Sequence, residues 1–157
     1  MGLDMYLRRK KYIGANYEHR NVTGNVKIKI NDKEIPVDFK RLTYIEEEGC
    51  YWRKANQIHK WFVDNVQGGN DNCGCYYVST KNMKELLDLC KEVKENPSKA
   101  PELLPTQDGF FFGGTEYDEW YFKDIDYTID ELTRLLDEEK QMNEDGFYSD
   151  FEYHSSW

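Results

Sequence analysis

Residues 25–39 read NVKIKINDKEIPVDF, and this segment carries the clearest strand pattern in the 157-residue chain. Apolar side chains occupy every second position in each of its halves: Val26, Ile28 and Ile30, then Ile35, Val37 and Phe39. The polar run NDKE between the halves is typical of a turn, so the segment predicts a β-hairpin. Because proline has no N–H to donate to a neighbouring strand, Pro36 predicts that the second strand lies at a sheet edge.

The rest of the chain contains shorter strand patterns and three helical ones. Strands are predicted at residues 3–9, 73–80, 110–112 and 146–157, where apolar or aromatic side chains alternate or cluster. Helices are predicted at residues 52–67, at residues 81–95 with Thr80 as the N-cap, and from the motif TIDE onwards. In TIDE, Thr128 and Glu131 have the spacing of a capping box.

These strands and helices are interleaved without the glycine fingerprint of a dinucleotide-binding fold, which predicts an α+β fold. We expect a mostly antiparallel sheet with about three helices packed on it and a protruding β-hairpin. A chain of this length is typical of one domain with a sizeable core, so residues 1–157 are expected to form a single domain.

The net charge, the hydropathy pattern and the cysteines indicate where in the cell the protein is expected and which classes of partner it is expected to bind. A formal net charge of −9 argues against a general basic surface that would bind duplex nucleic acid. Without a long apolar run or an apolar signal-peptide region, we expect no membrane association and a cytoplasmic protein with reduced thiols. Cys73 and Cys75 lack the Cys-x-x-Cys spacing of a zinc site, so we interpret them as small buried side chains and expect neither a metal nor a cofactor.

The candidate binding site comes from the stretch CYWRKANQIHKWF, residues 50–62, within the first predicted helix. Beside an apolar stripe, one flank of that helix would gather five polar or aromatic side chains: Trp52, Arg53, Asn56, His59 and Lys60. A ring to stack on, amide and imidazole groups and cations together are typical of a ligand cleft. The alternative is that His59 and Asn56 are hydrogen-bonded at the core edge while Arg53 pairs with a surface acid.

A second candidate lies in GFFFGGTEYDEW, residues 109–120. Backbone N–H groups around Gly114, with the Thr115 hydroxyl, can bind an anion, although a tight turn at positive φ is the favoured explanation of the glycines. Asp118 and Glu119 are candidate acids for proton transfer. If this segment is extended, however, the two adjacent side chains point to opposite faces, which favours a solvated acidic loop. The sequence contains no recognisable nucleophile motif.

Three blocks together resemble a family of small, largely uncharacterised bacteriophage and prophage proteins. They are GLDMYL at residues 2–7, YWRKANQIHKWFVDNVQ at residues 51–67 and LLPTQDGFFFGGTEYDEWYFKDI at residues 103–125, and they cover about a third of the chain. The resemblance implies that the hairpin is a variable insertion at about residues 22–42. It transfers no catalytic residues. If the chain is phage-encoded, its expected location is the host cytoplasm.

The sequence suggests three alternative functions. The first is a phage accessory protein that binds a small anionic, nucleotide-type ligand and sequesters a host immune signal, with Gly114 and Thr115 joining the helix flank. The second is an interaction protein that blocks a host protein through its acidic, aromatic tail from Asp118 onwards, or by mimicking nucleic acid. The third is a nucleotide or phosphoester hydrolase in which His59 acts as acid or base, assisted by Asp118 or Glu119. A homo-oligomer is left open in each case.

Overall fold

The computed structural model describes residues 2–157 as an α+β fold with a mostly antiparallel sheet, as the sequence predicts. Four strands form the main sheet in the order β4-β1-β6-β5, and every neighbouring pair is antiparallel. The strands are β1 (Asp4–Tyr12), β4 (Tyr44–Arg53), β5 (Cys75–Val78) and β6 (Ser149–Ser156). The helices are α1 (Asn56–Asn65), α2 (Thr80–Glu95), α3 (Ala100–Leu103) and α4 (Glu119–Glu144), together with the 3₁₀ turns η1 (Glu18–Arg20), η2 (Phe39–Arg41) and η3 (Pro97–Lys99).

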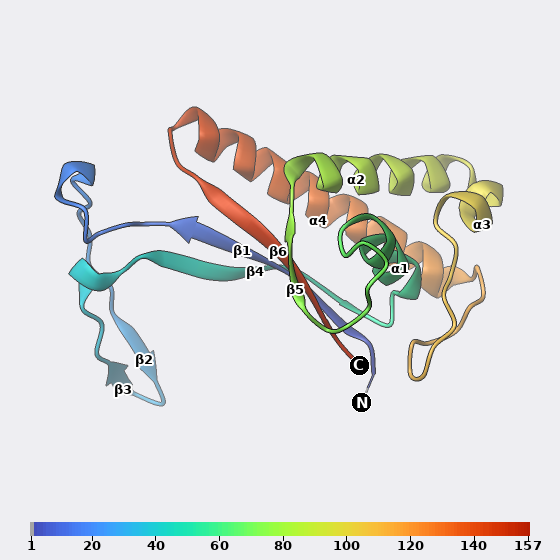
Figure 1. The fold of residues 1–157 in the computed structure, drawn as a ribbon, viewed down its shortest axis with the longest axis horizontal. Coiled ribbons are helices and arrows are strands. Elements are labelled where there is room, and N and C mark those ends of the chain that lie inside the picture. The colour runs from blue at the N-terminus through green and yellow to red at the C-terminus, as the bar shows by residue number, and fades with distance from the viewer. Residues whose placement is uncertain (1) are drawn as a thin grey trace.

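The helices cover one face of the main sheet (Figure 1). Alternate residues of β1 are buried on that face, including Met5 and Leu7, while the residues between them are partly exposed. The 26-residue helix α4 contributes a buried stripe that includes Ile125, Leu132 and Leu135. This stripe packs in the same apolar core as the inward side chains of β1. The apolar side chains at helical spacing on α4 and those at alternate positions of β1 therefore pack together in one core.

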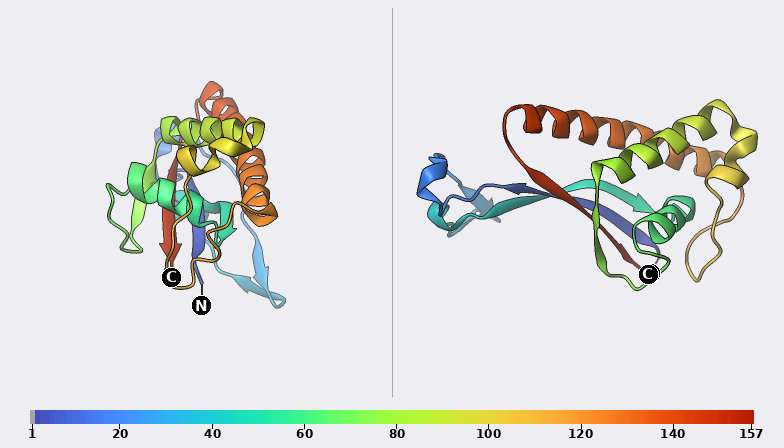
Figure 2. Two further views of the ribbon diagram at one scale, coloured as in Figure 1. Left: turned by 90° about the vertical axis from the view of Figure 1, so that its right-hand side faces the viewer. Right: turned by 45° about the horizontal axis from the view of Figure 1, so that its top comes forward.

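The predicted hairpin is confirmed as a separate two-stranded sheet, β2 (Ile28–Ile30) and β3 (Lys33–Ile35). The turn residues Asn31 and Asp32 have φ values of 49° and 62°, a left-handed conformation that Asn and Asp tolerate better than other non-glycine residues. The second strand ends before Pro36. The hairpin belongs to a projecting segment, residues 13–43, which we call the arm and which extends away from the sheet and helices (Figure 2).

The predicted strands at residues 3–9, 73–80 and 146–157 are confirmed as β1, β5 and β6, and the helix at residues 81–95 is confirmed as α2. The predicted N-cap at Thr80 is one residue late, since the Ser79 side chain accepts the Asn82 backbone N–H and forms the capping box. The predicted strand at residues 110–112 is wrong. These residues form a loop in which Phe111 has a φ of 66°, which is incompatible with a strand.

Two predicted helix starts are also wrong. Helix α1 begins at Asn56 rather than Trp52, because Trp52 pairs with Met5 in the β1–β4 ladder and β4 continues to Arg53. Helix α4 begins nine residues before Thr128, at Glu119, where the Asp118 carboxylate caps it. Thr128 lies inside the helix, and its hydroxyl donates to the Asp124 carbonyl at 2.7 Å.

The cysteines divide by location. Cys50 and Cys90 are buried, and burial raises the pKa of both thiols. Cys73 is half-buried and Cys75 is exposed, so the interpretation of Cys75 as a buried side chain is wrong. Within residues 2–157 no group of three or more His, Cys, Asp or Glu side chains is arranged to hold a metal. No helix of this part of the chain is both long enough and apolar enough to cross a membrane.

Candidate functional site

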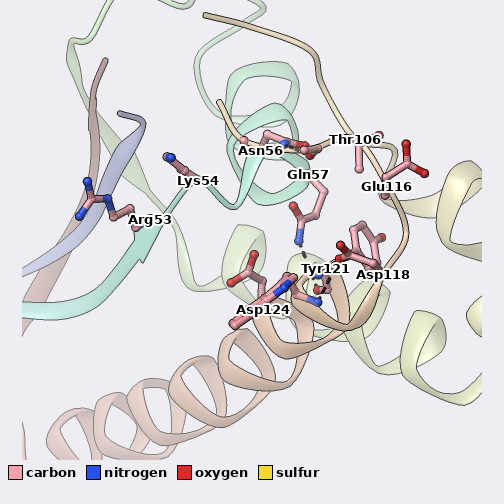
Figure 3. A pocket seen from close by; sticks show the side chains of 12 residues that line it. Arg53, Lys54, Asn56, Gln57, Thr106, Glu116, Asp118, Tyr121 and Asp124 are labelled. Carbon is pink, nitrogen blue, oxygen red and sulfur yellow. Dashed lines mark hydrogen bonds between the residues drawn. The ribbon is translucent and has the colours of Figure 1, made fainter. Parts of the chain in front are cut away.

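A pocket of about 270 Å³ opens where the β4–α1 turn, the loop before α4 and the first turns of α4 meet (Figure 3). Arg53 and Lys54 lie on one side of it, and Glu116 and Asp118 lie on the other. Between these walls are the side chains of Gln57 and Asp124, and Asn56, Thr106, Gly113, Gly114, Trp120 and Tyr121 complete the lining. We call this site the charged pocket, because both cationic and carboxylate side chains line it.

An unusual backbone conformation places Lys54 at the pocket. Its φ is +61°, a left-handed value that costs about 1–3 kcal/mol for a residue of this type. The Lys54 N–H donates to the Leu3 carbonyl at 2.8 Å, and its own carbonyl accepts the Asn56 N–H at 2.9 Å. Gly113 packs against this turn, and a Cβ atom there would lie 3.1 Å from the Lys54 Cβ. Neighbouring backbone therefore holds Lys54 in its strained conformation.

Asn56, the first residue of α1, fixes the loop that closes the pocket. Its Nδ2 donates to the carbonyls of Phe112 at 3.2 Å and Gly114 at 2.8 Å, and its Oδ1 accepts the Gln107 N–H at 3.0 Å. From the opposite side, the Tyr121 hydroxyl donates to the Leu104 carbonyl at 2.8 Å. Because its amide is already engaged at both ends, Asn56 organises the pocket wall rather than offering free groups to a ligand.

The acidic wall begins at the N-cap of α4. Asp118 Oδ1 accepts the N–H groups of Trp120 at 3.0 Å and Tyr121 at 3.1 Å. Asp124 lies further along the helix, where burial raises the pKa of its carboxyl from 3.8 to about 6. A hydrogen bond from Gln57 opposes this rise, and the nearby charge of Asp118 adds to it. Among the groups with shifted pKa values, Asp124 is the pocket residue that titrates near neutrality.

Asp124→Asn is expected to stabilise the protein at neutral pH. A carboxyl whose pKa is raised on folding stabilises the folded state when protonated, and this contribution is lost as pH rises from about 4 through about 6. Allowing for its partial exposure, the ionised group costs about 1–2 kcal/mol at pH 7.5. The free energy of unfolding, measured in denaturant, should therefore be higher for the variant at pH 7.5, with most of the gain absent at pH 4.

The control for this measurement is Asp126→Asn, because Asp126 is an exposed neighbour on α4 that pairs with Lys94 at 2.7 Å. It should produce no gain at either pH, since an exposed ion pair contributes little to stability. If the stability difference between wild type and Asp124→Asn is the same at both pH values, burial does not raise the pKa of the Asp124 carboxyl. The gain at neutral pH would also indicate that Asp124 is retained at a cost to stability.

The structure brings together only part of the residue set inferred from sequence. Arg53, Asn56 and Gly114 line the charged pocket, whereas Trp52, His59, Lys60 and Thr115 do not. The predicted helix flank does not exist, because Trp52 and Arg53 are consecutive residues of β4 and point to opposite faces of the sheet. Trp52 is only 2% exposed and Arg53 is 60% exposed at its side chain, as this alternation requires. Lys60 pairs with Asp64 on the surface of α1.

His59 belongs to a buried hydrogen-bonded cluster rather than to the pocket. Its side chain is fully buried, with Nδ1 2.8 Å from the Tyr153 hydroxyl and Nε2 3.0 Å from Asp71 Oδ2. The indole N–H of Trp157 donates to the other Asp71 oxygen at 3.1 Å. The cluster ties α1 to β6 and to the loop after α1. His59 is therefore a hydrogen-bonded residue of the protein interior, as the alternative interpretation of the sequence has it.

The sequence did not single out most of the residues that line the pocket, namely Lys54, Gln57, Thr106, Gly113, Glu116, Trp120, Tyr121 and Asp124. Trp120, Tyr121 and Asp124 lie on the first turns of α4, before the helix start that the sequence predicts at Thr128. A pattern that could have found them is the cap residue Asp118 followed by apolar residues at Tyr121, Ile125 and Leu132, which have helical spacing. No comparable sequence pattern pointed to Gln57 as a pocket residue.

Comparisons with known proteins do not extend this description. No family model matches the chain, and neither the curated proteins nor the solved structures contain a match to it.

Proposed function

We propose that the charged pocket binds a small anionic, nucleotide-type ligand. The observation that carries this proposal is the strained backbone that presents Lys54 at the pocket opposite a set of carboxylates. Within residues 2–157, Lys54 forms no ion pair, so its ammonium group is available for a ligand. Backbone strain of this kind is concentrated at binding and active sites, because the surrounding structure must stabilise it.

The cationic side of the pocket suits a phosphate group. The Arg53 guanidinium is 3.9 Å from Asp4 Oδ1, which is a weak and exposed ion pair. Its planar N–H groups can instead bind two phosphate oxygens at once, with Lys54 as a second cation beside them. An anion bound there would gain charge-assisted hydrogen bonds from two consecutive residues of the chain.

The opposite side suits the base of a nucleotide. The Trp120 ring is 65% exposed at the rim of the pocket, and Lys123 Nζ lies 4.0 Å from its centroid over the ring. The remaining ring surface can stack on a base, an interaction worth about 1–3 kcal/mol per base. Asp118 and Asp124 supply oxygen acceptors for N–H groups on the edge of that base. The ligand class that matches both sides carries a phosphate and a donor-bearing ring.

We propose binding without turnover as the activity. In the hydrolase alternative His59 would be the acid or base, but both its ring nitrogens are engaged and its side chain is fully buried. A hydrolase would then depend on Asp124, the pocket carboxyl whose pKa is about 6. Together with the resemblance to phage proteins, a binding pocket supports the proposal that the protein sequesters a nucleotide signal of the host.

The test is a panel of linear and cyclic nucleotides examined by thermal unfolding. A ligand at a hundredfold its dissociation constant should add about 2.7 kcal/mol to the free energy of unfolding. Chromatography of the ligand recovered after incubation separates the two activities. Intact ligand supports sequestration, whereas cleaved product would overturn it in favour of hydrolysis. If no member of the panel shifts the unfolding temperature, the nucleotide proposal fails.

For a nucleotide found in this way, Arg53→Ala and Lys54→Ala should each weaken binding by about 1.5–3 kcal/mol, roughly tenfold to more than a hundredfold. The loss follows from removing a charge-assisted contact to phosphate, and calorimetric titration measures it. Arg53→Ala should leave the free energy of unfolding within about 0.5 kcal/mol of wild type, because the side chain is mostly exposed.

Lys60→Ala is the matched control, since Lys60 is a nearby cation that pairs with Asp64 and lies outside the pocket. It should bind the same nucleotide as tightly as wild type does. If both pocket variants are folded and also bind with wild-type affinity, the phosphate cannot lie against Arg53 and Lys54. The proposed orientation of the ligand would then be wrong.

A further inference from the structure

The charged pocket contains a half-buried carboxylate for which the protein supplies no cation. Asp124 lines the pocket from α4, yet it forms no ion pair in the part of the chain that the structure describes. The adjacent residue Lys123 pairs with Glu119 instead, at 3.9 Å. Burial raises the pKa of the Asp124 carboxyl to about 6, so the group is still largely ionised at neutral pH. A ligand that brings N–H donors to this carboxylate would replace the water that it loses on burial.

The protein satisfies only part of the Asp124 carboxylate. Gln57 is a buried residue of α1 whose side chain points toward α4 (Figure 3). A hydrogen bond from Gln57 favours the ionised form of Asp124, and the same Nε2 donates to the Tyr121 carbonyl at 3.4 Å. An ionised carboxylate has about four lone-pair positions and no donor, so acceptor capacity remains. A ligand that uses both oxygens must therefore present two donors side by side.

The ring proposed to stack on a base lies one helical turn before this carboxylate. Trp120 and Asp124 are four residues apart on α4, so their side chains are neighbours on one face of the helix, and both line the pocket. Lys123 Nζ covers one face of the Trp120 ring, which leaves the other face for stacking. A base stacked on Trp120 would therefore have the Asp124 carboxylate near its edge.

The common bases differ in what they present to a carboxylate. Guanine alone has two adjacent donors on its pairing edge, the N1–H group and the N2 amino group. Adenine and cytosine pair one amino group with a ring-nitrogen acceptor, and the N3–H group of uracil lies between two carbonyl oxygens. Each of these three bases would place an acceptor lone pair against a carboxylate oxygen, which is repulsive because an ionised carboxylate only accepts.

We propose that the charged pocket selects guanine nucleotides and that Asp124 reads the base by accepting its N1–H and N2–H groups. This inference rests on the proposed nucleotide binding and adds the identity of the base. Arg53 and Lys54 bind the phosphate whatever the base is, and Trp120 stacks on any base, whereas Asp124 discriminates. A site that hydrogen-bonds specific polar groups of a ligand rejects analogues that lack them, because its own polar atoms are then unpaired.

The test is calorimetric titration with guanosine, inosine, xanthosine and adenosine monophosphates, which share the ribose and the phosphate. Inosine monophosphate lacks only the N2 amino group, so it should bind about tenfold more weakly than guanosine monophosphate. Xanthosine and adenosine monophosphates place an acceptor against Asp124 and should bind about a hundredfold more weakly. If a nucleotide without guanine binds as tightly as its guanine counterpart, guanine selection is overturned while nucleotide binding stands. If no nucleotide binds, both proposals fail.

Asp124→Asn should reverse the preference between two of these ligands. An asparagine amide presents one acceptor and one donor, which match the N1–H group and the O2 atom of xanthine. The variant should therefore bind guanosine monophosphate about tenfold more weakly and xanthosine monophosphate about tenfold more tightly than wild type. Since Asp124→Asn is expected to stabilise the protein at neutral pH, a loss of binding would not reflect unfolding.

Asp126→Asn is the matched control, because Asp126 is an exposed residue of α4 that pairs with Lys94 and lies outside the pocket. It should keep the wild-type order of affinities. If Asp124→Asn also keeps that order, Asp124 does not read the base, even though the pocket binds nucleotides.

Discussion

Arg9→Ala is expected to lower the free energy of unfolding by about 3–5 kcal/mol. The Arg9 side chain is 1% exposed, and its Nη2 donates to Glu139 Oε2 at 2.7 Å. Its Nη1 donates to Glu138 Oε2 at 2.9 Å, and its Nε donates to Ser149 Oγ at 3.0 Å. One guanidinium therefore links β1 to α4 and β6. Without it, the carboxylate of Glu139, which is 6% exposed, is left in the interior without a cation.

Denaturant unfolding of three further variants checks this account. The double variant Arg9→Met/Glu139→Leu should recover most of the loss, because removing both charges also removes their desolvation cost. Arg8→Ala, on the same strand, should change stability by less than about 0.5 kcal/mol, since Arg8 is 40% exposed and 3.9 Å from Glu46. Glu139→Leu alone should be destabilising. If Arg9→Ala and Arg8→Ala prove equally mild, the buried ion pair contributes no more than a surface pair does.

Trp52→Ala is expected to cost about 3–5 kcal/mol, the usual range for deleting a buried large ring. The Trp52 side chain is 2% exposed, its indole N–H donates to Thr128 Oγ1 at 2.9 Å, and its ring packs against Phe62 and Tyr127. Trp52→Phe should keep most of the packing and lose less stability. Thermal and denaturant unfolding measure both changes.

Trp120 provides the matched control for Trp52, because it is a tryptophan of the pocket rim that is 65% exposed. Trp120→Ala should leave stability nearly unchanged and weaken ligand binding, whereas Trp52→Phe should leave binding unchanged. The opposite result, in which Trp52→Phe loses binding while Trp120→Ala retains it, would restore the stacking role that the sequence suggested for Trp52. Comparing the two tryptophans thus distinguishes a residue that stabilises the core from a residue that contacts the ligand.

The sequence predicted those elements whose determinants are local. In the hairpin, strand alternation and the Asn31-Asp32 turn lie within a few residues of each other, and both are confirmed. The start of α1 was missed because Lys54 adopts a left-handed backbone without being a glycine or an asparagine. Its conformation depends on Leu3 and Gly113, which are distant in sequence. Local spacing cannot report such a constraint.

The candidate site shows the same limit. Arg53 and Asn56 were predicted because they lie in a block of polar and aromatic residues, but the acidic wall was assigned to a loop. TIDE misled the interpretation, since its capping-box spacing occurs inside α4, where Thr128 bonds back to the Asp124 carbonyl. The pocket exists only because α4 begins at Glu119, after the cap residue Asp118, and its first turns lie opposite the β4–α1 turn. That arrangement depends on the packing of segments that are distant in sequence, which local sequence patterns do not report.

The order of strands in the main sheet has a consequence for biosynthesis. Strand β6, at residues 149–156, lies between β1 and β5 and pairs with both. While the ribosome is still translating the earlier part of the chain, β1 and β5 have no partner between them, and their backbone groups remain open to other chains. The Tyr153 hydroxyl, which contacts His59, is also supplied at this late step. Cotranslational folding can therefore build the β1–β4 pair and the α2 helix early, but the sheet is completed only after β6 leaves the exit tunnel.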